Sequence, residues 1–416
     1  MDHRSVALCR DHRKLLHLRC GLSGDPGATP VGMTGCAAVQ DELAPHTVCR
    51  GWQGPSPAVP WSGSCPWAVV PSPRRRHRPP GRWCPSVILP SLPPSAPSPA
   101  FLACRRRFCM AAASWPAFER WDGKRWSVVH TSNASVALQV NVSSVSCTSP
   151  EFCVAVGSTL DFHPWAMRWD GTRWSAMTIP GENEQLNGVD CLPADTCIAV
   201  GSQIVTASRS VALAERWDGR RWARMPAPTS GNGALFGLYC TSPTWCMAVG
   251  PYAAGDMSAL WNGAKWSFGP VVVGLGRPGL ESAVSCISDR ACLALGESSP
   301  LPSPRLASWD GSRWSPVPSA YKNPPGDSAG LSGVSCYPTH GCFAVGLEGE
   351  VPNGSGCCRI PLMESWDGTK TSIVPQPASV HALSALSGVS CAPEGPCVAV
   401  GSNSEPPSAR PLIEMS

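Results

Sequence analysis

Cys147–Trp174 reads CTSPEFCVAVGSTLDFHPWAMRWDGTRW, and its skeleton is C-x5-C-x-A-V-G followed by R-W-D-G-x-x-W. This skeleton returns down the chain with loops of variable length between its two halves. Starting at Cys147, successive first cysteines lie 44, 49, 46, 50 and 55 residues apart. A repeat of this length is typical of propeller blades with four short strands, and also of armadillo-type helical repeats.

The local chemistry of the units decides between those two architectures. Each unit is rich in Val, Trp, Ser and Gly, carries Pro in most of its loops, and lacks a long run of apolar residues at helical spacing. The expected fold class is therefore all-β, a β-propeller of about seven four-stranded blades, with six or eight blades as the alternatives. The repeat domain is expected to span residues 101–416.

The cysteines of the repeats come in pairs with a regular gap. The pairs are Cys147 with Cys153, Cys191 with Cys197, Cys240 with Cys246, Cys286 with Cys292, Cys336 with Cys342, Cys391 with Cys397, and a shorter-spaced pair, Cys104 with Cys109. A zinc site needs four ligands, and no unit supplies a second Cys or His pair at consistent spacing. Facing positions on antiparallel strands suit a disulfide, which in a loop this short contributes about 2 kcal/mol. We therefore expect structural disulfides and an oxidising compartment.

The cysteine pair of each unit is expected to sit in a β-hairpin. In the first full unit, residues 142–147 and 153–157 form the strands, and the turn between them carries Pro150. On the second strand Val154 and Val156 point to one face, and the small residues of the C-x-A-x-G pattern point to the other. A neighbouring sheet is expected to approach this small-residue face closely.

The second half of each unit is expected to be a hairpin turned by Asp-Gly, the pair that favours a two-residue type I′ turn. Such a turn at Asp170-Gly171 pairs Trp169 with Thr172 and places Trp174 diagonally on the same face. It places the basic residue before the second Trp, here Arg173, on the opposite face. Indoles buried between blades would each contribute about 150 to 250 Å² of apolar area, and stacking on a ligand is the functional alternative. The residues concerned are Trp121, Trp126, Trp169, Trp174, Trp217, Trp222, Trp261, Trp266, Trp309, Trp314 and Trp366.

The repeats also carry a resemblance. The units SSVSCTSPEFCVAVGS…AMRWDGTRWS and LSGVSCYPTHGCFAVG resemble those of secreted actinobacterial repeat proteins of WD40- or Kelch-like propeller architecture. The resemblance covers residues 101–416. It implies a propeller fold and export from the cytoplasm, and it implies no particular activity.

Residues 1–100 differ in composition from the repeats. They hold 17 of the 45 prolines and 11 Lys+Arg against 5 Asp+Glu, so they account for the net charge of +4. They show no hydrophobic periodicity, and we expect a disordered segment or a misassigned start that is dispensable for folding. Charges scattered through Met1–Cys20 leave no recognisable signal peptide at Met1, and no apolar run is long enough to span a membrane. Ala100–Ala103 is the candidate for a strand that closes the last blade.

Motifs for catalysis are missing from the sequence. It contains no G-x-S-x-G, no H-E-x-x-H and no phosphate loop, so we expect no cofactor and no metal. Residues 101–416 hold 22 Lys+Arg and 24 Asp+Glu. This balance lacks the positive excess that nucleic-acid binding requires, so no nucleic-acid partner is expected.

Function is expected in the variable loops, since rigid scaffolds present their binding residues there. The candidate binding residues are Asp161, His163, Trp165, Tyr252, Asp256, Cys357 and Cys358. We expect a monomeric, secreted or cell-surface binding module for a carbohydrate, cell-wall or protein partner. The alternative is a propeller enzyme, such as a glycosidase, a lyase or a quinoprotein. Two or more carboxylates, or a metal cluster, converging at the central channel would favour that alternative.

Overall fold

The structure is a computed structural model of the 416-residue chain. It describes residues 6–11, 14–19, 37–38, 84–88, 99–105, 107–113, 117–129, 131, 140–227, 231–252, 255–272, 283–297, 303–322, 328–338, 341–349, 360–375, 384–392, 397–403 and 410–415. The chain divides into two compact units, Met1–Gly81 and Arg82–Ser416.

The unit Met1–Gly81 contains one small antiparallel sheet. Its strands are β1 (Val6–Asp11), β2 (Lys14–Arg19) and β3 (Ala37–Ala38), with β2 in the middle. The disorder expected for residues 1–100 falls mostly on residues outside those that the structure describes.

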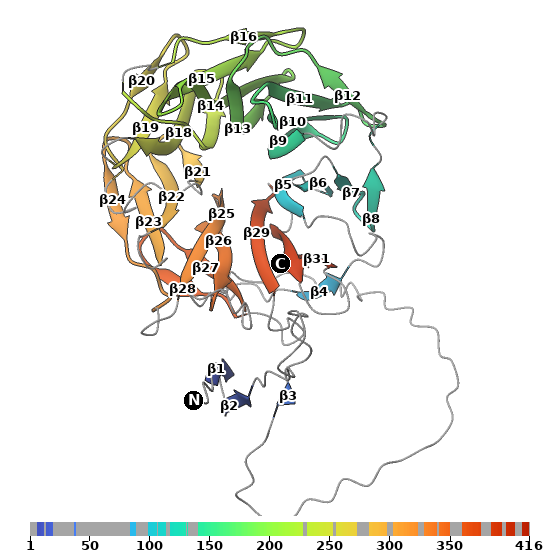
Figure 1. Ribbon diagram of the computed structural model, residues 1–416, viewed down its shortest axis with the longest axis vertical. Coiled ribbons are helices and arrows are strands. Elements are labelled where there is room, and N and C mark those ends of the chain that lie inside the picture. Colours follow the sequence, from blue (N-terminus) through green and yellow to red (C-terminus); the bar gives the residue numbers. More distant parts are fainter. Residues whose placement is uncertain are drawn as a thin grey trace, which may run out of the picture. The chain divides into compact units, whose positions relative to one another are not determined.

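The unit Arg82–Ser416 is a β-propeller, and its described residues form seven antiparallel sheets of four strands each (Figure 1). From the innermost strand outwards, the blades are β5 (Pro99–Arg105), β6 (Phe108–Ala113), β7 (Phe118–Trp121), β8 (Trp126–Val129); β9 (Val140–Ser149), β10 (Phe152–Thr159), β11 (Pro164–Trp169), β12 (Trp174–Met177); β13 (Glu184–Leu192), β14 (Thr196–Thr206), β15 (Arg209–Trp217), β16 (Trp222–Arg224); β17 (Gly237–Ser242), β18 (Trp245–Tyr252), β19 (Gly255–Trp261), β20 (Trp266–Phe268); β21 (Ala283–Ser288), β22 (Ala291–Glu297), β23 (Pro304–Trp309), β24 (Trp314–Val317); β25 (Ala329–Tyr337), β26 (Gly341–Glu348), β27 (Ile360–Trp366), β28 (Thr371–Ile373); and β29 (Ser384–Cys391), β30 (Cys397–Asn403), β31 (Arg410–Met415), β4 (Cys84–Ile88). The predicted fold class is confirmed.

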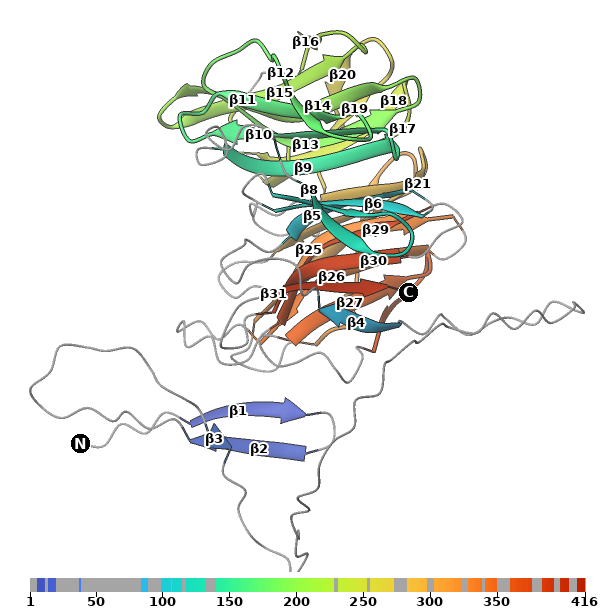
Figure 2. The same cartoon turned by 90° about the vertical axis from the view of Figure 1, so that its right-hand side faces the viewer.

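The innermost strands close into a ring. Each of β5, β9, β13, β17, β21, β25 and β29 contacts the next, and β29 contacts β5. Within the ring, consecutive blades pack face to face, as β9–β12 and β13–β16 do in Figure 2. Ring closure explains why the repeats form one compact unit, because every blade buries both of its faces.

The last blade is closed by a strand from the other end of the repeat region. β31 pairs antiparallel with β4, with Leu412 opposite Ile88. Ala100–Ala103, the segment considered for this task from the sequence, instead belongs to β5, the inner strand of its own blade. The compact unit accordingly begins at Arg82, before the boundary expected at residue 101.

A row of four side chains crosses each of the six blades from β5–β8 to β25–β28 in register. In blade β9–β12 the row is Cys147, Cys153, Trp169 and Trp174, one residue from each strand. The first two residues form a disulfide, and the two indole centroids lie 5.9 Å apart. Within the described residues, seven disulfides with Cα–Cα distances of 3.9 to 4.1 Å join the pairs Cys104–Cys109, Cys147–Cys153, Cys191–Cys197, Cys240–Cys246, Cys286–Cys292, Cys336–Cys342 and Cys391–Cys397. Ten of the eleven indoles named from the sequence are buried, and Trp121 is half-buried.

The Asp-Gly hairpins differ from the predicted two-residue turn. Trp169 pairs directly with Trp174, so four residues form the loop. The Asp170 Oδ1 atom accepts the backbone N–H groups of Thr172 and Arg173, both at 2.9 Å, and Gly171 has a φ of 94°. The aspartate side chain thus satisfies the N–H groups of a longer loop, which the two-residue prediction ignored. Arg173 consequently lies exposed in the loop, with its Nε 3.6 Å from Asp170 Oδ2, and not within a strand as predicted.

The two faces of each blade pack against different neighbours. Val154 and Val156 contact the core of the following blade, which includes Leu186, Ala199 and Trp217. The reason why glycine occupies position 157 differs from the predicted one, which was close approach of a neighbouring sheet. A Cβ at this position would lie 2.0 Å from the Asn141 carbonyl oxygen of the adjoining inner strand, so the bulge within the sheet requires glycine.

Candidate functional site

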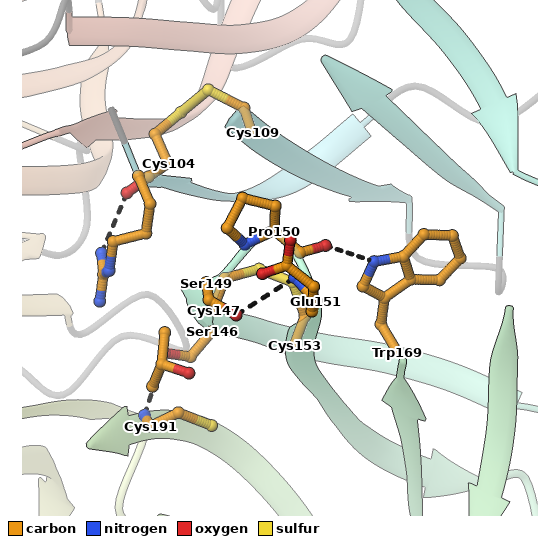
Figure 3. The surroundings of a disulfide bond; sticks show 12 residues. Cys104, Cys109, Ser146, Cys147, Ser149, Pro150, Glu151, Cys153, Trp169 and Cys191 are labelled. Atoms are coloured by element: carbon orange, nitrogen blue, oxygen red, sulfur yellow. Dashed lines mark hydrogen bonds between the residues drawn. A yellow bond between two sulfur atoms is a disulfide. The ribbon is translucent and has the colours of Figure 1, made fainter. Parts of the chain in front are cut away.

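The two ends of the propeller carry different kinds of loop. The Trp169 indole N–H donates to the Pro150 carbonyl oxygen at 3.0 Å, so the W-D-G loop lies beside the turn of the cysteine hairpin (Figure 3). We call this end, which carries Pro150 and Asp170, the cysteine end. The opposite end, which carries Leu160–His163 between β10 and β11, we call the loop end.

The binding residues proposed from the sequence gather at the loop end as far as they are described. Asp161 and His163 are exposed in the turn between β10 and β11, whereas Trp165 lies on β11, half-buried against the core. Tyr252 is half-buried at the end of β18, with its ring centroid 5.7 Å from that of Phe268. Asp256 follows in β19 with its side chain outside the described atoms, and Cys357 and Cys358 lie outside the described residues.

The loop end also exposes apolar side chains that the sequence analysis missed. The strongly exposed large hydrophobic residues of the described chain are Leu160 (66%), Phe162 (44%), Val205, Phe268, Val271 (63%) and Ile373. All of them lie in loop-end connections or in the last two residues of a strand that leads into one. Five of the six belong to three consecutive blades, β9–β12, β13–β16 and β17–β20, or directly follow them. These exposed apolar side chains at one end of three consecutive blades are a candidate interaction surface.

Hydrogen bonds to neighbouring strands hold the turn that carries Phe162 and the segment before β13 in place. The Phe162 carbonyl accepts the Glu184 N–H at 2.7 Å, and the Asn183 carbonyl accepts the Ile204 N–H at 2.7 Å. Phe162 and Asn183 have φ values of 59° and 57°, in the left-handed region that Asn adopts far more often than Phe, so Phe162 is the unusual residue. Strained backbone of this kind persists where surrounding bonds impose it and is concentrated at binding sites.

A second candidate site is the central channel. It encloses about 770 Å³ and is lined by the inner strands of all seven blades. Half of its lining residues are Ser, Gly or Val, and the charged residues among its described lining are Arg105 and Asp190. The volume falls within the range of about 300 to 1,000 Å³ that small-molecule sites occupy.

A ring of hydrogen bonds joins the inner strands around this channel. The serine before the first cysteine of a pair accepts the backbone N–H of the first cysteine in the next blade, as Ser146 Oγ does from Cys191 at 3.0 Å (Figure 3). The other serine links, at 2.9 to 3.0 Å, are Ser285 with Cys336, Ser335 with Cys391, and Ser390 with Cys104. The Val-Ser-Cys triplet that recurs in four repeats is the sequence signal for these links. The sequence analysis considered only the cysteine of this triplet.

Asp190 occupies the serine position in blade β13–β16. Its Oδ2 atom accepts the Cys240 N–H at 2.7 Å, and its Oδ1 atom accepts the Ser146 hydroxyl at 3.2 Å. Removal from water raises the pKa of Asp190 to about 6, although these bonds and the charge of Arg105 act in the opposite direction. Burial, together with the Asp190 carboxylate, raises the pKa of Tyr239. Arg105, Asp190 and Tyr239 therefore form one electrostatic cluster.

The buried glutamates Glu119, Glu184, Glu215 and Glu364 do not line the channel. Glu364 accepts hydrogen bonds from Ser319 Oγ at 2.5 Å and from the N–H groups of Ala320 and Tyr321 at 3.0 and 3.2 Å, so it anchors a loop of the preceding blade. Glu119 is 4% exposed, and within the described residues neither of its carboxylate oxygens has a hydrogen-bond partner. Burial raises the pKa of Glu119 to about 7.

Two further buried glutamates, Glu184 and Glu215, belong to an ion-pair triad. Arg224 Nε lies 2.9 Å from Glu215 Oε1, and the same guanidinium also contacts Glu184. Burial is the main cause that raises the pKa of Glu215 to about 7, against the opposing charge of Arg224. Glu184, Glu215 and Arg224 all belong to blade β13–β16, so the triad joins strands of a single blade.

Over the described ranges, no group of three or more His, Cys, Asp or Glu residues is arranged to hold a metal ion. In the same part of the chain, no helix has the length and apolar character needed to cross a membrane.

Comparison with known proteins shows the fold alone. No protein-family model and no curated protein matches this sequence. Among solved structures, U3-55K is similar with a TM-score of 0.55 and 12% identity over 76% of this chain and 95% of that one. YCF48 from Cyanidioschyzon merolae has a TM-score of 0.52 and 14% identity, covering 80% and 98%. A streptogramin B lyase has a TM-score of 0.53 and 8% identity, covering 80% and 97%.

Proposed function

We propose that this chain is an extracytoplasmic binding module that recognises a carbohydrate, cell-wall or protein partner through its loop end. The seven disulfides indicate an oxidising environment, which supports a secreted or cell-surface location. The proposed module acts as a single chain, because the propeller closes its own ring.

The observation that carries this proposal is the apolar surface at the loop end. The apolar side chains of Leu160, Phe162 and Val271 are exposed to solvent. This exposure does not stabilise the chain by itself, whereas a partner that covers these side chains would gain from burying them. The neighbouring loops are fixed by inter-blade hydrogen bonds, so a partner would meet a preorganised surface. Asp161 and His163, on the same turn, supply polar groups beside it.

The enzyme alternative finds less support. A glycoside hydrolase of the usual kind needs two carboxyl groups flanking the scissile bond. Asp190 is the one carboxylate among the described residues that line the channel. The similarity to a lyase fold does not change this, since function depends on the site and not on the fold.

The test combines a ligand panel with paired surface variants. Immobilised full-length chain is screened for binding to arrayed glycans, cell-wall fragments and purified extracellular proteins. For each ligand found, Phe162→Ser and Val271→Ser are expected to weaken binding about tenfold or more, since exposed apolar anchors dominate such interfaces. The matched control is Lys124→Ser at the cysteine end, which should leave binding unchanged. A ligand that responds to Lys124→Ser and ignores both loop-end variants would overturn the proposal.

A further inference from the structure

The repeats provide an internal reference for the channel wall. At the position before the first cysteine, four blades carry serine: Ser146, Ser285, Ser335 and Ser390. The three exceptions are Ala103, Asp190 and Tyr239, on β5, β13 and β17. Every blade has the same strand arrangement at this position. A residue other than serine therefore changes the side chain at the channel wall while the backbone stays the same.

The exceptions occur together on one side of the ring. β5 contacts β9, β9 contacts β13, and β13 contacts β17, whereas β21, β25 and β29 all keep the serine. Arg105 belongs to the same side, directly after the first cysteine of its pair, where other blades carry uncharged residues such as Thr148 and Thr241. The departures from the repeat pattern therefore put a carboxylate, a guanidinium and a phenol on the same side of the channel wall.

The cluster keeps hydrogen-bonding capacity toward the channel. An ionised carboxylate offers about four acceptor sites and a guanidinium five donors. Asp190 uses acceptor sites for Cys240 and Ser146, and Arg105 donates from its Nη1 atom to the Cys104 carbonyl oxygen at 3.0 Å. Both residues line the cavity, so their remaining capacity faces any molecule inside it.

Charge and polarity narrow the class of that molecule. The positive charge of Arg105 and the negative charge of Asp190 cancel. The carboxylate therefore repels an anion that the guanidinium attracts, and the guanidinium repels a cation that the carboxylate attracts. The remaining polar lining consists mainly of serine hydroxyls and the amides of Asn141 and Asn187. Such groups suit a neutral ligand whose hydroxyls both donate to the carboxylate and accept from the guanidinium.

We propose that the channel binds a small neutral polyhydroxylated ligand, a mono- or disaccharide, held by Asp190, Arg105 and Tyr239 near the cysteine end. This site is separate from the loop-end surface. Asp190 lies two residues before the cysteine-end terminus of β13, and Arg105 is the last residue of β5. Failure of either proposal therefore leaves the other standing.

The repeat pattern supplies substitutions that should preserve the fold. Asp190→Ser installs the residue that accepts the equivalent cysteine N–H in four other blades. Arg105→Thr installs the residue found at the same position in blades β9–β12 and β17–β20. Lys124→Ser, in the exposed W-D-G loop of blade β5–β8 and outside the channel lining, is the control.

Isothermal titration calorimetry of the full-length chain provides the measurement, with glucose, galactose, N-acetylglucosamine and their disaccharides as probes. We expect one or more of these sugars to bind, Asp190→Ser and Arg105→Thr each to weaken that binding about tenfold or more, and Lys124→Ser to leave it unchanged. Thermal melts of the same variants should match the parent chain. Sugar binding that survives both cluster substitutions would overturn the proposal, and so would binding of acetate, glycine or Mg²⁺ by a chain that binds none of the sugars.

Discussion

Blade β9–β12 and the last blade, β29–β31 with β4, build the same sheet in two ways. In the first, the W-D-G loop connects the third and fourth strands covalently. In the second, the fourth strand comes from residues 84–88 and pairs with β31 across the chain. The difference shows that six blades depend on local hairpins, whereas the seventh depends on bringing distant parts of the chain together.

The sequence around β4 supports this equivalence. Arg82-Trp83-Cys84-Pro85 repeats the pattern Arg313-Trp314-Ser315-Pro316 of blade β21–β24. Met415 stands opposite Cys84 as Ser308 stands opposite Ser315. β4 is thus the second half of a Trp hairpin whose first half lies at the other end of the repeats, a relation that the sequence analysis overlooked.

Removal of β4 should have the largest effect. A chain that begins at Pro99 lacks the fourth strand of the last blade, and we expect it to lose more stability than any single substitution below, over roughly 5 kcal/mol. A chain that begins at Arg82 should melt like the full chain, because the compact unit starts there. Differential scanning calorimetry of the three chains decides the matter. Equal melts for all three would restore the sequence-based expectation that the first hundred residues are dispensable.

Within a covalently closed blade, the indole row should contribute most. Trp169 is 2% exposed, and Trp169→Ala is expected to cost about 3 to 5 kcal/mol in urea unfolding, as comparable core truncations do. The control is Trp165→Ala, whose half-buried side chain should cost clearly less. A Trp169→Ala variant as stable as the parent chain would mean that the indole is not part of the core.

The buried glutamates should give the blades different pH dependence. Burial raises the pKa of Glu119 from 4.5 to about 7, so the unfolded chain releases this proton before the folded one does, and stability falls as pH rises from about 4.5 to 7. Glu119→Gln should therefore regain up to about 3 kcal/mol at pH 8 relative to pH 4. The measurement is urea unfolding of both proteins at the two pH values.

Glu364 provides the contrast for that experiment. Its carboxylate accepts three hydrogen bonds, so Glu364→Gln should lower stability at pH 8 where Glu119→Gln raises it. If both variants shift stability in the same direction, the distinction between a partnered and an unpartnered carboxylate is wrong.

The inter-blade serine should have the smallest effect. Ser335→Ala leaves the Cys391 N–H without its side-chain acceptor and is expected to cost about 1 kcal/mol. The blade with Ala103 at the equivalent position shows that the ring tolerates one such absence. Chemical denaturation against the parent chain measures this cost, and a loss comparable to that of Trp169→Ala would make the serine ring a main support of the fold.

Several features could be predicted because they depend on neighbours in sequence. The period of the repeats, the alternation along Cys153–Gly157 and the C-x5-C gap indicate four-stranded blades with cysteines that face each other. The same local patterns placed the variable loops at one end. The turn type was predicted wrongly because the Asp170 side chain accepts the backbone N–H groups of Thr172 and Arg173. The general preference of Asp-Gly for a two-residue turn does not take such side-chain hydrogen bonds into account.

The sequence by itself determined the blade, since strands, turns and cysteine pairs within one unit lie within a few residues of one another. Only the tertiary structure decided how blades meet. The closing pair β31–β4, the bond from Cys104 to Ser390 across 286 residues, and the cluster of Arg105, Asp190 and Tyr239 all join residues from different repeats. Such contacts follow from the ring geometry, which brings each inner strand beside the next and the last beside the first.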